Sequence, residues 1–197
     1  MTKPLLFTDI NGVLLNGARV TTPIPGRDEL LKTMFTHYDV VSWTSAVKYK
    51  HRQGKKIPHG VSRVKHAFQS YRSQLHKELY ADSCFDTGDL IWCEGYTKPK
   101  LVKSLSNLQK TTDATFVDEA PWVIMIDNDA YKIEDNEKVV RVICDLEECD
   151  SKAGLMKRLS ELLQKLAEGR LTIDSKQWNL TEEPEPPAKR MKLVDSV

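Results

Sequence analysis

A carboxylate stands where an apolar run stops, early in the sequence. Asp9 follows the strand-length segment 4–8 (Pro-Leu-Leu-Phe-Thr), and Asn11 and Gly12 come shortly after it. The carboxyl end of a buried strand is where open α/β sheets bind ligands, and an Asp there can attack a phosphorus atom or hold a divalent cation. Asp before Asn-Gly is also ordinary turn chemistry, so this position alone leaves both interpretations open.

Two further strand-like runs end in polar residues. Segment 122–126 (Trp-Val-Ile-Met-Ile) has the clearest pattern of a buried strand, and an Asp-Asn-Asp sequence follows it at 127–129. Segment 39–43 (Asp-Val-Val-Ser-Trp) is followed by Thr-Ser at 44–45. We expect these polar groups to share one site, because the carboxyl ends of parallel strands lie at the same edge of a sheet.

The remaining patterns predict the elements that would position this site. Segment 28–35 begins with two acidic residues and continues with apolar residues at helical spacing, which predicts a helix. Leucines between 155 and 166 fall on one face of a second helix. Strands are predicted at 90–93 and 139–143, and a loop running into a helix at 98–108. Strands alternating with helices indicate an α/β fold with a parallel sheet flanked by helices.

The basic residues of the chain are concentrated in one segment, although the formal net charge is only +1. Between Lys48 and Lys77 there are nine Lys or Arg residues, four His and no acidic residue. The segment suits a phosphate-attracting rim or an RNA-binding surface, or else it is a solvated helix face with a mobile flap. Phe68, Tyr71 and Leu75 predict a helix in its second half, after a loop-like start rich in Gly and Pro.

Length and composition bound the organisation of the chain. Its 197 residues predict one domain, residues 1–170, with the basic insertion at about 48–77, and a disordered tail, residues 171–197. The four cysteines show neither C-x-x-C nor zinc spacing, and no signal-peptide pattern precedes Asp9, which predicts reduced thiols in an intracellular protein. No apolar run approaches the ~18 residues of a membrane span, so no membrane partner is expected.

The tail contains a short basic cluster after a Pro-rich acidic stretch. Lys189-Arg190-Met191-Lys192 presents three cations in four residues. Such a cluster is read by nuclear import receptors, or it only aids solubility. We therefore expect an import receptor as a partner and the nucleus as the main location, with the cytoplasm as a second one.

Four pieces of sequence, in order, resemble the haloacid-dehalogenase (HAD) phosphatases. The resemblance is closest to the small RNA-polymerase C-terminal-domain phosphatases and NLI-interacting-factor-like proteins, and it covers roughly residues 5–143. The pieces are Pro25-Gly26-Arg27-Asp28-Glu29-Leu30-Leu31, Val41-Ser42-Trp43-Thr44-Ser45, Lys103-Ser104-Leu105-Ser106 and Asp127-Asn128-Asp129-Ala130-Tyr131-Lys132. The resemblance implies a HAD-like (Rossmannoid) sheet with little or no cap domain. It also implies a Mg²⁺-dependent phosphomonoesterase acting on phosphoserine or phosphothreonine in a phosphorylated protein.

The resemblance assigns a role to the residues that would meet the phosphoryl group. Asp9 matches the nucleophile that becomes an aspartyl-phosphate. Thr44 matches the hydroxyl that donates to the phosphoryl oxygens, with Ser45 as the alternative if the turn is shifted by one residue.

The resemblance also implies which residues offset negative charge. Lys103 matches the site lysine, and Lys98 and Lys100 are competitors for that role. Asp127 and Asn128 match the motif that holds Mg²⁺ together with the nucleophile. These roles agree with the physics, because a carboxylate can approach a dianionic phosphate only where cations offset the repulsion.

One position departs from the family pattern. Two residues after the nucleophile the family usually has a second Asp, which protonates the leaving group and then activates water. Asn11 stands there and can do neither, and such general acid–base help is typically worth ~10²–10⁴ in rate. The backbone carbonyl of Asn11 remains available to Mg²⁺. Two functions stay open: a weakened phosphatase, or a pseudophosphatase that binds a phosphoprotein or RNA.

Overall fold

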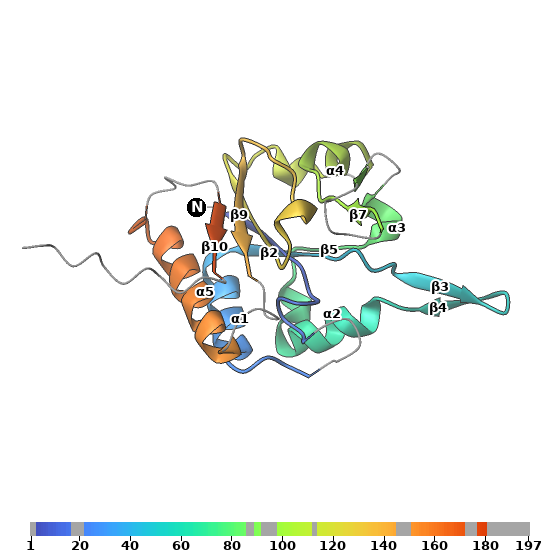
Figure 1. The fold of residues 1–197 in the computed structure, drawn as a ribbon, viewed down its shortest axis with the longest axis horizontal. Coiled ribbons are helices and arrows are strands. Elements are labelled where there is room, and N and C mark those ends of the chain that lie inside the picture. The colour runs from blue at the N-terminus through green and yellow to red at the C-terminus, as the bar shows by residue number, and fades with distance from the viewer. Residues whose placement is uncertain are drawn as a thin grey trace, which may run out of the picture.

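A six-stranded sheet forms the centre of the computed structural model, which describes residues 3–16, 22–85, 89–91, 98–111, 114–144, 151–171 and 177–180 (Figure 1). The strand order is β10-β9-β8-β1-β2-β5, and every neighbouring pair is parallel. The strands are β1 (Leu5–Thr8), β2 (Asp39–Trp43), β5 (Lys77–Leu79), β8 (Val123–Asp127), β9 (Val139–Ile143) and β10 (Gln177–Asn179). The predicted α/β class with a parallel sheet is confirmed.

The two central strands are β1 and β8, and both are buried along their whole length. Their residues point alternately to two apolar layers, which explains their continuous apolar sequences. Thr8 at the end of β1 lies opposite Ile126 of β8 and Ser42 of β2. The carboxyl ends of the three strands are therefore level with one another.

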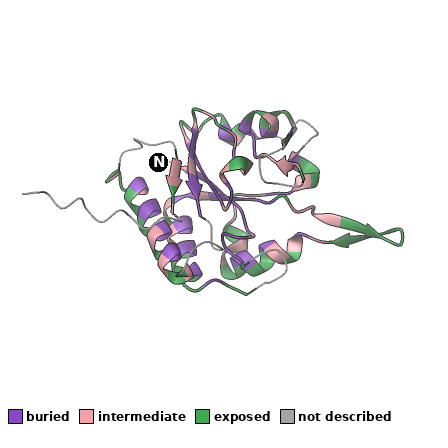
Figure 2. Ribbon diagram, viewed as in Figure 1, coloured by how far each residue is buried: buried purple, intermediate pink, exposed green. Residues whose placement is uncertain are grey.

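Helices cover both faces of the sheet (Figures 1 and 2). One apolar layer contains residues of α1 (Arg27–His37), α2 (Val61–Phe68) and α5 (Lys152–Ala167). The other contains residues of α3 (Ala81–Cys84), α4 (Leu105–Thr111) and the 3₁₀ turn Thr115–Val117. The hydroxyl of Tyr38 donates to the carbonyl of Leu163 at 2.6 Å, which fixes α5 beside the end of α1.

The basic segment differs from its prediction at both ends. Its start is a β-hairpin, β3 (Tyr49–Arg52) and β4 (Lys55–Pro58), where a loop was expected. The predicted helix is present as α2, continued by the 3₁₀ turn Gln69–Gln74, and the segment then ends in β5 of the main sheet. The hairpin was missed because its strands are polar on both sides and lack the alternation that identifies a half-buried strand.

Two other elements adjust the predicted boundaries. β6 (Leu90–Ile91) pairs with β7 (Lys100–Leu101) in a separate antiparallel sheet, so the predicted strand at 90–93 is described only in its first half. β10 joins the edge of the main sheet beside β9, beyond the expected domain end at residue 170.

Residues 181–197, with the basic cluster at 189–192, lie outside the described residues. Across the described part of the chain, no helix has the length and apolar character of a membrane span.

Candidate active site

Three neighbouring strands deliver polar residues to one edge of the sheet. Asp9 directly follows β1 and Asp127 ends β8. The backbone N–H of Asp9 donates to the carbonyl of Ile126 at 2.9 Å, which sets the two aspartates side by side. Thr44 directly follows β2 at the same edge. The structure thus brings together the strand ends that the sequence analysis singled out.

The loop after β1 packs tightly against the motif after β8. Gly12 has a φ of +81°, and its N–H donates to the carbonyl of Leu15 at 2.9 Å. A Cβ at Gly12 would lie 2.9 Å from Cγ of Asn128. Only glycine suits this position, because it tolerates the positive φ and leaves room for the Asn128 side chain.

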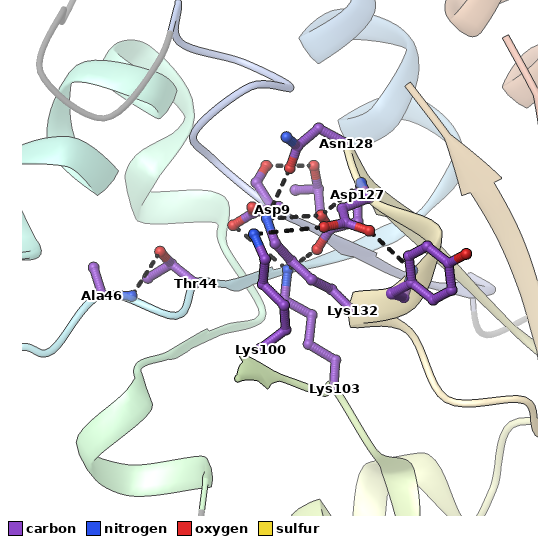
Figure 3. A network of polar contacts seen from close by, with 11 residues as sticks. Asp9, Thr44, Ala46, Lys100, Lys103, Asp127, Asn128 and Lys132 are labelled. Atoms are coloured by element: carbon purple, nitrogen blue, oxygen red, sulfur yellow. Dashed lines mark hydrogen bonds and ion pairs between the residues drawn. The ribbon is translucent and has the colours of Figure 1, made fainter. Parts of the chain in front are cut away.

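Lys103 is the lysine that joins the two aspartates (Figure 3). Its Nζ lies 2.5 Å from Oδ2 of Asp127 and 3.5 Å from Oδ1 of Asp9, and all three side chains are almost completely buried. Of its two competitors, Lys98 is exposed, and Lys100 contacts Asp129 at 3.8 Å. Geometry therefore favours Lys103 for the predicted role.

A second ammonium, which the sequence analysis gave no role, reaches the same site (Figure 3). Nζ of Lys132 donates to Oδ1 of Asn128 at 3.0 Å and lies 3.5 Å from Oδ1 of Asp127. A 3₁₀ turn, Ala130–Lys132, places it there, capped by the Asp129 carboxylate that accepts from the N–H of Tyr131. The available signal was its position four residues after Asn128.

The backbone holds the two lysines beside each other. The N–H of Lys103 donates to the carbonyl of Lys132 at 2.6 Å, and the N–H of Glu134 donates to the carbonyl of Lys103 at 3.1 Å. The connection before α4 and the turn after β8 therefore form one rigid support. Two carboxylates and two ammoniums meet there, so their formal charges cancel.

The pKa values of Asp9 and Lys132 both shift, because the groups are buried and because the carboxylates and ammoniums act on one another. Burial raises the pKa of the Asp9 carboxyl, and Asp127 adds to this, whereas Lys103 and Lys132 act in the opposite direction. Burial acts to lower the pKa of the Lys132 ammonium, but the carboxylates of Asp127, Asp9 and Asp129 outweigh it and raise that pKa. The site therefore favours a charged Lys132 and makes an ionised Asp9 energetically costly.

The other predicted residues lie around this cluster. The Thr44 hydroxyl is buried and accepts from the N–H of Ala46 at 3.2 Å, and Figure 3 shows it to one side of the aspartates. Ser45 is exposed. The buried Oδ1 of Asn11 has no hydrogen-bond partner among the described residues, and the same holds for Oδ1 of Asp9.

The oxygens at this edge fit a hard divalent cation. The described residues contain no cluster of three or more His, Cys, Asp or Glu side chains, but carboxylate and amide oxygens are the ligands that Mg²⁺ prefers. The predicted ligands are Asp9, Asn11, Asp127 and Asn128. Oδ1 of Asp9 and Oδ1 of Asn11 form no hydrogen bond among the described residues. Oδ1 of Asn128 accepts from the ammonium of Lys132, and Oδ2 of Asp127 accepts from that of Lys103.

A parallel sheet with aspartates at the ends of its two central strands is the architecture of the HAD-like phosphatases. A family model described as NLI interacting factor-like phosphatase matches residues 18–174, and the chain belongs to this family. The predicted resemblance is thus confirmed. The match begins after Asp9 and Asn11, so these two residues depend on the geometry alone. No curated protein matches the chain.

Proposed function

We propose that this phosphatase-family protein is a Mg²⁺-dependent phosphomonoesterase that acts on phosphoserine or phosphothreonine in proteins. The supporting observation is the Asp9 carboxylate, whose buried Oδ1 has no hydrogen-bond partner among the described residues and lies 3.5 Å from the Lys103 ammonium. An oxygen that is desolvated, unshared and next to a cation is suited to attack a phosphorus atom.

In the proposed reaction Oδ1 of Asp9 forms a bond to phosphorus while the bond from phosphorus to the seryl or threonyl oxygen breaks. The leaving oxygen takes its proton from water, because the Asn11 carboxamide cannot donate one as a general acid. Lys103 offsets the negative charge of the nucleophile and of the phosphoryl oxygens. The Thr44 hydroxyl donates to a phosphoryl oxygen. Mg²⁺, when held by Asp9, Asp127, Asn128 and the carbonyl of Asn11, supplies further charge stabilisation. Water then hydrolyses the aspartyl-phosphate and releases inorganic phosphate.

Substrate access requires a movement at the site, since the Asp9 side chain is only 3% exposed. Lys132 is the side chain we assign to this movement. It is more exposed than Lys103, at 17% against 3%, and its ammonium contacts Oδ1 of Asn128 and Oδ1 of Asp127. Displacement of Lys132 toward the incoming phosphate would remove a competing cation from these two oxygens.

A second function, phosphoprotein binding without turnover, is favoured by Asn11. A carboxamide cannot protonate the leaving oxygen or activate water, so phosphate would be bound but released unchanged. The site would then act as a pseudophosphatase. Asn11 is therefore the residue that discriminates between the two functions.

The test is a phosphatase assay on an aryl phosphate and on a phosphoserine peptide, with and without Mg²⁺. We expect slow Mg²⁺-dependent turnover by the wild type, none by Asp9→Asn, and a gain of about 10² or more in kcat for Asn11→Asp. Calorimetry with Mg²⁺ on the wild type and on Asp127→Ala tests the metal separately. No turnover by the wild type or Asn11→Asp, with retained phosphopeptide binding, would support the pseudophosphatase.

We also propose that the protein accumulates in the nucleus through the basic cluster at 189–192. The support is the sequence alone, three cations in four residues. At 22.5 kDa the protein could also diffuse through nuclear pores, so the test uses a large fluorescent fusion. Accumulation should be lost in Lys189→Ala/Arg190→Ala/Lys192→Ala, and accumulation that persists in this variant would contradict the proposal.

A further inference from the structure

The β3–β4 hairpin projects from the body of the molecule (Figure 1), and it follows β2, the strand whose carboxyl end is succeeded by Thr44 of the active site. It begins shortly after Thr44 and closes where the N–H groups of His59 and Gly60 donate to the carbonyls of Lys48 and Val47. Residues 50–58 are all exposed, as Figure 2 shows. Among the described residues, neither strand pairs with a third one. The hairpin therefore contributes little to the core.

The charges on this hairpin oppose its formation. Arg52 lies directly across from Lys55. Like charges in directly opposed positions destabilise a strand pair, and isolated two-stranded hairpins are marginal in water. The turn compensates, since Gln53 and Gly54 both have positive φ, the geometry of the tight turn that suits twisted hairpins.

The positive charge of the segment helps to lower the pKa of a nearby histidine, and two of its lysines lie near an aromatic ring. Burial together with the cations Lys50 and Arg63 lowers the pKa of His59 at the base of the hairpin. The ammonium of Lys56 lies 4.3 Å from the ring centre of Tyr49, and that of Lys48 lies 5.8 Å from it. The sequence has no acidic residue between Lys48 and Lys77. Arg72, at the far end of the segment, pairs with Glu78. Among the described residues, the hairpin cations form no ion pair.

We propose that the β3–β4 hairpin is a docking arm for an acidic segment of the phosphoprotein whose phosphate enters the active site. This inference rests on the proposed function for the identity of the partner. Two properties of the hairpin suit an acidic, extended segment: its positive charge and, among the described residues, its unpaired strand edges. Its cations Lys50, Arg52, Lys55 and Lys56 complement carboxylates, and its open strand edges offer backbone groups to an extended peptide.

An acidic peptide fits the hairpin better than RNA does. Single-stranded RNA is held by aromatic rings that stack on the bases. The hairpin carries one Phe, Tyr or Trp side chain, Tyr49, which is only partly exposed and is covered by the ammonium of Lys56, and one further ring, that of His51. With so few rings for stacking, the arm mainly presents charge and backbone groups.

The test compares Arg52→Glu/Lys55→Glu with the wild type. This variant keeps like charges across the same pair of positions, so the stability of the hairpin changes little while its charge is reversed. Lys32→Glu/Lys165→Glu, on exposed positions of α1 and α5, is the control with the same change in net charge. Fluorescence anisotropy at low and physiological salt measures binding of a phosphoserine peptide with an acidic flank, the same peptide with a neutral flank, and a single-stranded RNA.

We expect the hairpin variant to bind the acid-flanked peptide about tenfold more weakly, with a smaller salt dependence, while the control variant binds like the wild type. Hydrolysis of an aryl phosphate should be unchanged. Equal peptide binding by all three proteins would overturn the inference, as would RNA binding that is tighter than peptide binding and is lost in the hairpin variant. Hairpin-dependent peptide binding without any hydrolysis would support the docking arm and contradict only the proposed catalysis.

Discussion

The active site and the β3–β4 hairpin both depend on lysine, but they treat its charge in opposite ways. At the site, Lys103 and Lys132 are matched by Asp9 and Asp127 within 3.5 Å. On the hairpin, Lys50, Arg52, Lys55 and Lys56 are exposed, and Arg52 lies directly across from Lys55. Burial forces each charge to find a partner inside the protein, because an unpaired buried charge is costly. Exposure permits an excess of one sign, because exposed charges stay solvated by water. The proposed acidic partner would neutralise this excess from outside the chain.

The largest expected effect is the loss of Lys103. In Lys103→Met two buried carboxylates lose the ammonium that lies between them, and we expect the free energy of unfolding to fall by about 3–5 kcal/mol. Urea unfolding measures this change. Lys50→Met, on the hairpin, is the matched control and should leave the unfolding midpoint close to that of the wild type. Similar midpoints for the two variants would remove the contrast between the regions.

Removal of Lys132 should strengthen metal binding. In Lys132→Met, Oδ1 of Asn128 no longer accepts from an ammonium, the ion pair with Oδ1 of Asp127 is gone, and a like charge near the metal is removed. We expect Mg²⁺ affinity to rise about tenfold in calorimetry. Lys100→Met is the control, because its ammonium contacts Asp129, which is not a predicted ligand. Weaker Mg²⁺ binding by Lys132→Met would mean that this lysine supports the metal site instead of competing for it.

Single reversal of a hairpin charge should stabilise the hairpin. In Arg52→Glu an opposite-charge pair with Lys55 replaces two like charges. We expect amide exchange in β3 and β4 to slow by about two- to fivefold, while docking of an acidic peptide weakens. Arg52→Gln, which removes repulsion without adding attraction, should give an intermediate rate. Faster exchange in Arg52→Glu would show that the cations do not strain the hairpin.

The smallest expected effect is on His59. Burial and the nearby cations lower its pKa below the ordinary value of 6.5, so protonation costs the folded protein more than the unfolded chain. The stability of the hairpin base should therefore fall as the pH drops below about 6.5. In Lys50→Gln one of these cations is gone, and an NMR titration should show the pKa of His59 moving up. Lys165→Gln, far from His59 in the sequence and on α5, should leave it unchanged.

Strands with mostly apolar sequences were predictable, whereas the polar hairpin strands and the three-residue strands β5 and β10 were not. Segments 39–43 and 139–143 coincide with β2 and β9, and the predicted helix at 28–35 lies within α1. β5 and β10 have three residues each, and their place in the sheet comes from tertiary pairing with β2 and β9. The local sequence of so short a segment does not predict which strand it pairs with.

The same limit applies to the site. Asp9, Thr44 and Asp127 follow apolar strands, so their common edge could be predicted. Lys132 could not be, because its role depends on a turn that bends its ammonium back onto Asn128. The choice among Lys98, Lys100 and Lys103 likewise needed the backbone bonds that tie Lys103 to Lys132.

The central position of β1 has a consequence for the order of folding. β1 leaves the ribosome well before its neighbour β8 and before Lys103 and Lys132, whose ammoniums contact the buried aspartates. Until they arrive, burying Asp9 would leave its charge uncompensated, so the nascent chain is expected to keep this carboxylate hydrated. Pairing β1 with β8 also closes a long loop, which slows folding. Assembly of the phosphate-handling edge is therefore a late event, and the early chain passes through a stage in which its central strand is unpaired on one side.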